Sequence, residues 1–210
     1  MKPKQIAASS LVLVLAACGG TSETSQHPTQ KPTAHVSSGT ELERFFPLVD
    51  GNIYHYKTEL LVEGPAEPAG TLIVKVRRTS PTQGQLLRPT AQDFSYASNG
   101  IATTTKSGAP AFLMKWPIDS SQTWLGPQGG QTRYDNVNAT INTPAGTFQG
   151  CVVTIETRGG DLPVRVATTL CPTVGIVALE VQQAGAVERA ELVYYGEPID
   201  IGPDGLTTNK

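Results

Sequence analysis

The chain has 210 residues and a formal charge of −2, and only 16% of its residues are charged. This mild acidity gives no electrostatic footprint for nucleic acid or for anionic lipid headgroups, and the length fits one domain of ordinary size better than two. With 21 glycines and 16 prolines, the composition is typical of a β-rich protein with many turns and argues against a helical one.

The first 20 residues combine two lysines, a short apolar run and a cysteine. Lys2 and Lys4 precede the apolar run 6–17, which would rise only about 18 Å as a helix and is too short for a hydrocarbon core of about 30 Å. The stretch 15–18, Leu-Ala-Ala-Cys, resembles the lipobox of bacterial lipoproteins. In that family the signal is cut before the cysteine, the cysteine sulfur receives a diacylglycerol, and the new amino group is usually acylated as well.

The resemblance implies that residues 1–17 are a signal peptide and that Cys18 is the lipidated first residue of the mature protein. An ordinary secretory signal with a chance cysteine and a transmembrane helix are the alternatives, and the short apolar run disfavours the helix. Two or three acyl chains hold a protein on a membrane effectively permanently. The resemblance therefore implies a lipid-anchored protein of the cell envelope, and Gly19 after the cysteine resembles proteins released to the outer membrane.

A polar stretch follows the cysteine. Residues 19–40 contain Val36 as their only sizeable apolar side chain. Such a composition cannot bury enough apolar surface to offset the entropy of ordering, so 18–40 is interpreted as the lipidated cysteine and a disordered tether. With 22 residues after the cysteine, the typical reach of the tether is about 25 Å.

The folded domain is predicted over 41–197, and 198–210 is predicted to be a flexible tail. A helical turn is expected over 41–46, and most of the domain alternates apolar and polar residues as half-buried strands do. The sequence predicts an all-β, mainly antiparallel fold, a single domain with a curved or partly closed sheet. Strands are predicted over 52–62, 71–79, 85–88, 94–97, 101–106, 111–116, 134–142, 148–158, 164–171, 176–183 and 187–195.

Two cysteines remain for the fold once the first is allocated to lipid. If 151–158 and 164–171 form a symmetric hairpin, paired residue numbers sum to about 322, which places Cys151 directly opposite Cys171. The sequence thus predicts a structural disulfide; two separate buried thiols are the alternative, and redox chemistry is disfavoured because there is no Cys-x-x-Cys. This register leaves apolar residues on both faces of the hairpin, so it requires a sheet buried on both sides or a bulge.

The segment 143–152, Thr-Pro-Ala-Gly-Thr-Phe-Gln-Gly-Cys-Val, resembles a turn and strand found in a loose set of uncharacterised β-rich bacterial lipoproteins. The same set carries an aromatic-Pro-aliphatic pattern with a later aromatic, matched by 46–54 and 116–124, and a Val-Gly-aliphatic-Val strand, matched by 174–177. The resemblance implies a β-rich lipoprotein and brings no activity with it. Read from the residues alone, the Pro-Ala-Gly stretch is turn chemistry.

The sequence lacks the motifs of the common catalytic chemistries. Of its three histidines only His55 lies in the predicted domain, where it is expected on the surface, and no nucleophile elbow, zinc-protease motif or phosphate loop is found. We therefore expect no enzyme, no metal and no cofactor. A mechanism that uses carboxylates near Asp135 or Glu156 is the alternative.

Four aromatic side chains are the candidates for facing a ligand: Tyr54, Tyr56, Trp116 and Trp124. Aromatic residues on a curved sheet either line an apolar cavity or fill the core. The expected function is a non-enzymatic binding or adaptor role at the envelope, with a protein partner or an apolar ligand and without nucleic acid. An envelope enzyme and a carrier of lipids or lipoproteins are the alternatives.

Overall fold

The computed structural model describes residues 41–62, 64–202 and 205–207, so the predicted signal peptide, Cys18 and the tether lie outside the described residues. One short helix, α1 (Glu41–Phe45), comes first, in agreement with the predicted helical turn. The strands that follow are β1 (Ile53–Val62), β2 (Glu67–Ser80), β3 (Gln83–Leu87), β4 (Ala91–Ala97), β5 (Gly100–Thr104), β6 (Pro110–Lys115), β7 (Thr123–Leu125), β8 (Gln131–Thr143), β9 (Gly146–Arg158), β10 (Val164–Cys171), β11 (Gly175–Gln183), β12 (Ala186–Gly196), β13 (Asp200–Gly202) and β14 (Gly205–Thr207).

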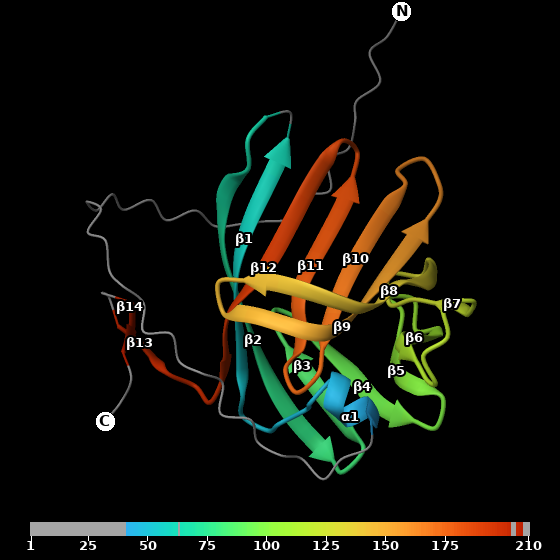
Figure 1. Cartoon of the computed structure of the whole chain (residues 1–210), viewed down its shortest axis with the longest axis horizontal. Coiled ribbons are helices and arrows are strands. Elements are labelled where there is room, and N and C mark those ends of the chain that lie inside the picture. Colours follow the sequence, from blue (N-terminus) through green and yellow to red (C-terminus); the bar gives the residue numbers. More distant parts are fainter. Residues whose placement is uncertain (1–40, 63, 203–204, 208–210) are drawn as a thin grey trace, which may run out of the picture.

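Twelve strands form one antiparallel sheet in the order β6-β5-β4-β3-β2-β1-β12-β11-β10-β9-β8-β7. The sheet curves until its two ends meet, which gives a nearly closed, barrel-like shape (Figure 1). Side chains hold the ends together: the indole N–H of Trp124 donates to the carbonyl oxygen of Phe112 at 2.9 Å, and the Tyr134 hydroxyl donates to that of Lys115. The predicted all-β, single-domain fold is confirmed.

The observed strands differ from the predicted ones at a few places. Strand β10 has the predicted bounds, whereas β2 begins at Glu67, four residues before the predicted start at residue 71. Strand β7 was not predicted, because its three residues are too few to show an alternating pattern. Strands β13 and β14 form a separate small sheet in the tail, where no strand was expected. No helix among the described residues is long and apolar enough to cross a bilayer.

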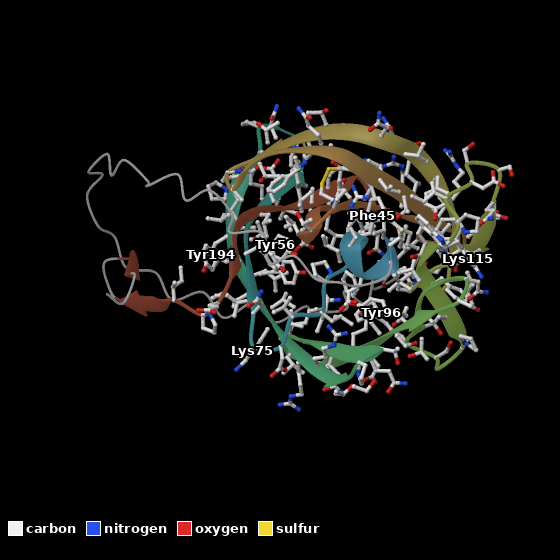
Figure 2. All side chains as sticks on the ribbon, turned by 60° about the horizontal axis from the view of Figure 1, so that its bottom comes forward. Phe45, Tyr56, Lys75, Tyr96, Lys115 and Tyr194 are labelled. Atoms are coloured by element: carbon white, nitrogen blue, oxygen red, sulfur yellow. A yellow bond between two sulfur atoms is a disulfide. The ribbon has the colours of Figure 1, made fainter. Side chains whose placement is uncertain are left out.

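The inside of the sheet is filled by side chains from α1 and from alternate strand positions. Figure 2 looks toward the end at which α1 lies and shows the helix within the ring of strands. Phe45, Tyr56 and Tyr96 point toward this interior, whereas Lys75 and Lys115 point away from it (Figure 2). The sheet therefore encloses a packed core on the side that the predicted alternation assigned to apolar residues.

The long hairpin of β8 and β9 bends. Its distal part, residues 136–148, lies over the outside of the sheet and is called the arm below. The arm crosses β10, β11 and β12 (Figure 1), and Ala145 at its tip donates a backbone hydrogen bond to the carbonyl oxygen of Leu192 at 3.0 Å. Gly150 lies where β9 bends and has φ of +67°, a conformation that glycine adopts without the strain other residues incur. Three register shifts between β8 and β9 accompany the bend.

The β9–β10 hairpin has the predicted register. Residues 164–170 pair with 158–152, and Cys151 is bonded to Cys171 with their Cα atoms 4.2 Å apart. Both cysteines are fully buried on the outer face of the hairpin, where the arm covers them, while Val166 on the other face is buried in the core. The predicted disulfide is confirmed, and burial on both sides explains why both faces are apolar.

Candidate functional site

Residues 41–48 close one end of the sheet from the inside. The side chains of Phe46 and Leu48 are 1% exposed, and the Phe46 ring lies 4.9 Å from that of Phe94 on β4. The Tyr96 hydroxyl donates to the carbonyl oxygen of Phe46 at 2.7 Å and accepts from the backbone N–H of Leu48 at 3.1 Å. Burial raises the pKa of Tyr96 to about 12, and the two hydrogen bonds of its protonated hydroxyl hold the segment in place.

Three of the four aromatic residues proposed to face a ligand belong to the packed core. Tyr54, Tyr56 and Trp124 are 2%, 6% and 7% exposed. The Tyr54 hydroxyl donates to the carbonyl oxygen of Val174 at 2.8 Å, and the Tyr56 hydroxyl donates to that of Ile176 at 2.9 Å. Burial raises the pKa of both tyrosines, which keeps the hydroxyls as donors. These side chains fill the interior and present no face to a ligand.

Trp116 is different, because it is only partly buried and lines a groove beside α1. The groove has a volume of about 410 Å³ and is walled by four segments that are distant in the sequence. They are α1, the turn between β2 and β3, the end of β4 and the residue after β6. The lining residues are Glu41, Leu42, Glu43, Pro81, Thr82, Tyr96, Ala97, Ser98 and Trp116. This groove is the candidate functional site.

The charges around the groove are balanced in pairs. Glu43 faces the guanidinium of Arg78 at 2.6 Å, and Arg78 also donates to the carbonyl oxygen of Ser80 at 3.2 Å, which ties α1 to the turn between β2 and β3. Glu41 pairs with Arg44 at 3.2 Å on the exposed side of α1. Each carboxylate is thus met by an arginine, and the walls between them are mainly apolar. Such a site favours an uncharged, apolar group over an ion.

The two carboxylates proposed for an enzyme mechanism lie apart. Glu156 is 5% exposed in the interior, where one carboxylate oxygen accepts a hydrogen bond from the backbone N–H of Gly130 at 2.7 Å. Asp135 is exposed on the outside, 3.6 Å from Arg133. A Cβ atom at Gly126 would lie 2.3 Å from the second oxygen of Glu156, so the carboxylate fills the space that this glycine leaves. Glu156 holds the loop between β7 and β8.

The described part of the chain shows no metal centre. No group of three or more His, Cys, Asp or Glu side chains among these residues is placed so that it could hold an ion. His55, expected on the surface, is half-buried on the outer side of β1, where it pairs with Tyr194 of β12 and Ile73 of β2. Its Nδ1 atom is buried without a hydrogen-bond partner, and burial lowers its pKa.

Glu156 makes a pH-dependent contribution that can be measured. Burial raises its pKa, and the hydrogen bonds from the backbone of Gly130 and Gln128 only partly oppose this. The folded state therefore binds more protons than the unfolded state between the ordinary glutamate pKa and the raised one, so the free energy of unfolding falls as pH rises through that window. We expect Glu156→Gln to remove this fall, as measured by urea unfolding at a series of pH values.

The matched control for this prediction is Glu180 on β11. Burial raises its pKa, but the hydrogen bonds from Arg189 and Gln182 outweigh burial and leave the pKa lowered. Its stabilising contribution is therefore present at neutral pH and is lost as pH falls through the lowered pKa, the opposite sign. Glu180→Gln should leave the fall above the ordinary glutamate pKa intact. An unchanged pH profile in Glu156→Gln would contradict the assignment of that fall to Glu156.

The groove could not be found from any local sequence motif. Its walls come from four segments separated by 38, 14 and 18 residues along the chain, and only their folding brings Leu42, Pro81 and Tyr96 together. Trp116 was the one wall residue that sequence reasoning singled out, because it is one of only two tryptophans. The acidic residues of α1 carried no signal, since charged residues in a first helical turn are common.

Comparison with known proteins adds distant structural similarities. No protein-family model and no curated protein matches the chain. A candidate lipoprotein from Parabacteroides distasonis is similar in structure, with 13% identity and a TM-score of 0.47 over 72% of this chain and 98% of that one. A candidate exported protein with a YmcC-like fold from Bacteroides fragilis has 12% identity and a TM-score of 0.46 over 73% of this chain and 99% of its own.

Proposed function

We propose that this chain is a lipid-anchored protein of the cell envelope with a non-enzymatic binding role, and that its binding site is the groove beside α1. The lipobox-like stretch 15–18 supports the anchor, and Gly19 favours the outer membrane. One observation carries the binding role: the partly exposed Trp116 lies in an apolar-walled groove, while the other candidate aromatic residues are buried.

The ligand that fits this groove is an uncharged apolar group. Leu42, Pro81 and Ala97 offer aliphatic surface, and Tyr96 and Trp116 offer aromatic surface. Burial of apolar surface contributes about 25 cal/mol per Å², and a groove of about 410 Å³ is within the usual size of small-molecule sites. Because hydrogen bonds fix Tyr96 and the segment it holds, the walls are formed before the ligand arrives. Little ordering is then required on binding.

A titration with the uncharged apolar fluorophore N-phenyl-1-naphthylamine tests the proposal. We expect saturable binding to the wild type, with energy transfer from tryptophan to the bound probe. Ala97→Trp adds a bulky ring at the wall of the groove and should weaken binding at least about tenfold, which corresponds to about 1.4 kcal/mol. The readout is the dissociation constant from probe fluorescence.

Leu162→Trp is the matched control, because it adds the same side chain at the tip between β9 and β10, where Leu162 is 59% exposed. It should bind the probe as the wild type does. Equal affinity in Ala97→Trp would place the probe outside the groove, and no saturable binding to the wild type would contradict the apolar-ligand role. A protein partner would then remain to be sought by crosslinking at the groove.

The non-enzymatic part of the proposal is supported by the positions of the carboxylates. The Glu156 carboxylate accepts a hydrogen bond from the backbone N–H of Gly130. Asp135 lies on the outside of the sheet, where it pairs with Arg133. The two do not converge on a shared space in which a substrate could meet both. This separation supports a non-enzymatic role over a mechanism that would use these two carboxylates together.

A further inference from the structure

We propose that the α1 end of the sheet rests on the lipid surface in which the Cys18 anchor is inserted, with Trp116 at the contact. This inference rests on the proposed anchor and goes beyond it, because an anchor alone does not orient the domain. The occupant of this end is the bilayer itself.

The chain enters the fold at the α1 end. Glu41 begins α1 and also lines the groove, so the segment that leads back to Cys18 leaves from this end. Only 22 residues separate Glu41 from Cys18. A chain of that length and composition has a typical end-to-end distance of about 25 Å, which brings the α1 end within reach of the bilayer.

The sheet is long enough to separate its two ends by more than the tether's typical reach. The hairpin tips between β1 and β2, β9 and β10, and β11 and β12 lie at the end opposite to α1 (Figure 1). Strand β1 (Ile53–Val62) alone spans about 33 Å at 3.3 Å per residue. If the tips faced the bilayer, Glu41 would stand more than the typical tether length above it. The α1 end is therefore the favoured membrane-facing end.

The side chains at the α1 end also suit a lipid surface. Trp116 is partly exposed there, followed by Pro117, which is exposed, and Ile118, which is partly exposed; Pro81 of the neighbouring wall is exposed as well. Tryptophan is enriched where proteins meet the membrane interface, because its ring is apolar and its N–H is polar. The two glutamates of α1 pair with Arg44 and with Arg78 of β2, so these four groups together carry no net charge that opposes the contact.

Charge pairing also predicts which lipids matter. The two arginines at α1, Arg44 and Arg78, are each paired with a glutamate and so offer no free positive charge to anionic headgroups. The contact with the membrane should therefore be mainly apolar. We expect the same contact on vesicles of phosphatidylcholine as on vesicles that also contain phosphatidylglycerol, and little change with salt.

The two tryptophans of the chain provide a matched experiment. The lipidated full chain is reconstituted into phosphatidylethanolamine and phosphatidylglycerol vesicles that contain a doxyl-labelled phospholipid, and recovery by flotation confirms the anchor. In Trp124→Phe, Trp116 is the sole tryptophan and should lose most of its emission to the quencher. In Trp116→Phe, the buried Trp124 should lose little. Circular dichroism establishes that both variants are folded.

A third variant reports on the opposite end. Leu162→Trp combined with Trp116→Phe and Trp124→Phe places the sole tryptophan at the tip between β9 and β10, and its emission should be unaffected by the quencher. Protein that floats without quenching of Trp116 overturns the inference and leaves the anchor standing. Quenching at the tip, alone or together with Trp116, also overturns it. Failure to float overturns the anchor, and the orientation falls with it.

Discussion

Replacing Phe46 by alanine is expected to lower the free energy of unfolding by about 3–5 kcal/mol, the usual loss for a fully buried phenylalanine. Phe46 is 1% exposed, and its ring packs 4.9 Å from Phe94. The loss combines the apolar surface that returns to water with the cavity left behind inside the closed end of the sheet. Urea unfolding followed by tryptophan fluorescence measures it.

The size of this effect follows from where the segment lies. Residues 41–48 enter the interior as a short helix and an extended stretch, so their apolar side chains have strands around them. The backbone of Phe46 is held by Tyr96, so the chain cannot easily collapse into the space that the ring leaves. Poor collapse is the condition under which large-to-small substitutions cost most.

Phe112→Ala is the matched control. Phe112 on β6 is only partly buried, and its ring carries the Lys115 ammonium 3.5 Å from its centroid. Removal of this ring should cost clearly less than removal of Phe46, because part of its surface is already in water. If the two variants lose the same free energy, residues 41–48 are not an integral part of the core.

Local patterns in the sequence predicted most strands of this fold. The alternation in 52–62 placed Tyr54 and Tyr56 on one face, and the structure buries both in the interior. The symmetric hairpin predicted the pairing of 164–170 with 158–152 because a short turn fixes the register of the strands beside it. Such features depend on residues that are near each other in the chain.

Features that depend on distant segments could not be predicted in this way. The register of the β9–β10 hairpin required a second buried face, but nothing in the sequence indicated that the arm of β8 and β9 would supply it. The arm depends on the bend at Gly150 and on the docking of Ala145 against Leu192, which lies 47 residues further along the chain. The groove was even harder to predict from the sequence, because four separate segments form its walls.

Local sequence also could not tell which of the two tryptophans would be buried. Composition and alternation could not separate Trp116 from Trp124, since each is a single tryptophan near a short strand. Their roles differ because Trp124 lies where β7 meets β6 and donates to Phe112, whereas Trp116 lies just beyond the end of β6 beside α1. Closure of the sheet decides which of the two is buried.

Removal of the disulfide is the second large effect that we expect. Cys151→Ala with Cys171→Ala should lower the free energy of unfolding by about 3 kcal/mol, because the bond closes a loop of about 20 residues in the unfolded chain. For a domain of this size that loss corresponds to a fall in Tm of roughly 6–12 °C. Calorimetry in a Cys18→Ser background measures it without the lipid.

The structure predicts which part of the domain should become less stable when the disulfide is removed. The two cysteines are fully buried between the β9–β10 hairpin and the arm that crosses it, close to the bend at Gly150. Without the bond, β10 no longer fixes β9 at the point where the arm departs. Hydrogen exchange should therefore rise most in the arm, over 136–148, and least in the strands around Tyr54.

Cys18→Ser alone is the control for this comparison, because it removes the cysteine that precedes the folded domain and leaves the disulfide intact. Its Tm should equal that of the delipidated wild type. A double variant with unchanged Tm would show that the hairpin and the arm hold their places without the bond. Faster exchange spread evenly over the whole sheet would show instead that the bond stabilises the domain as one unit and does not fix the arm in particular.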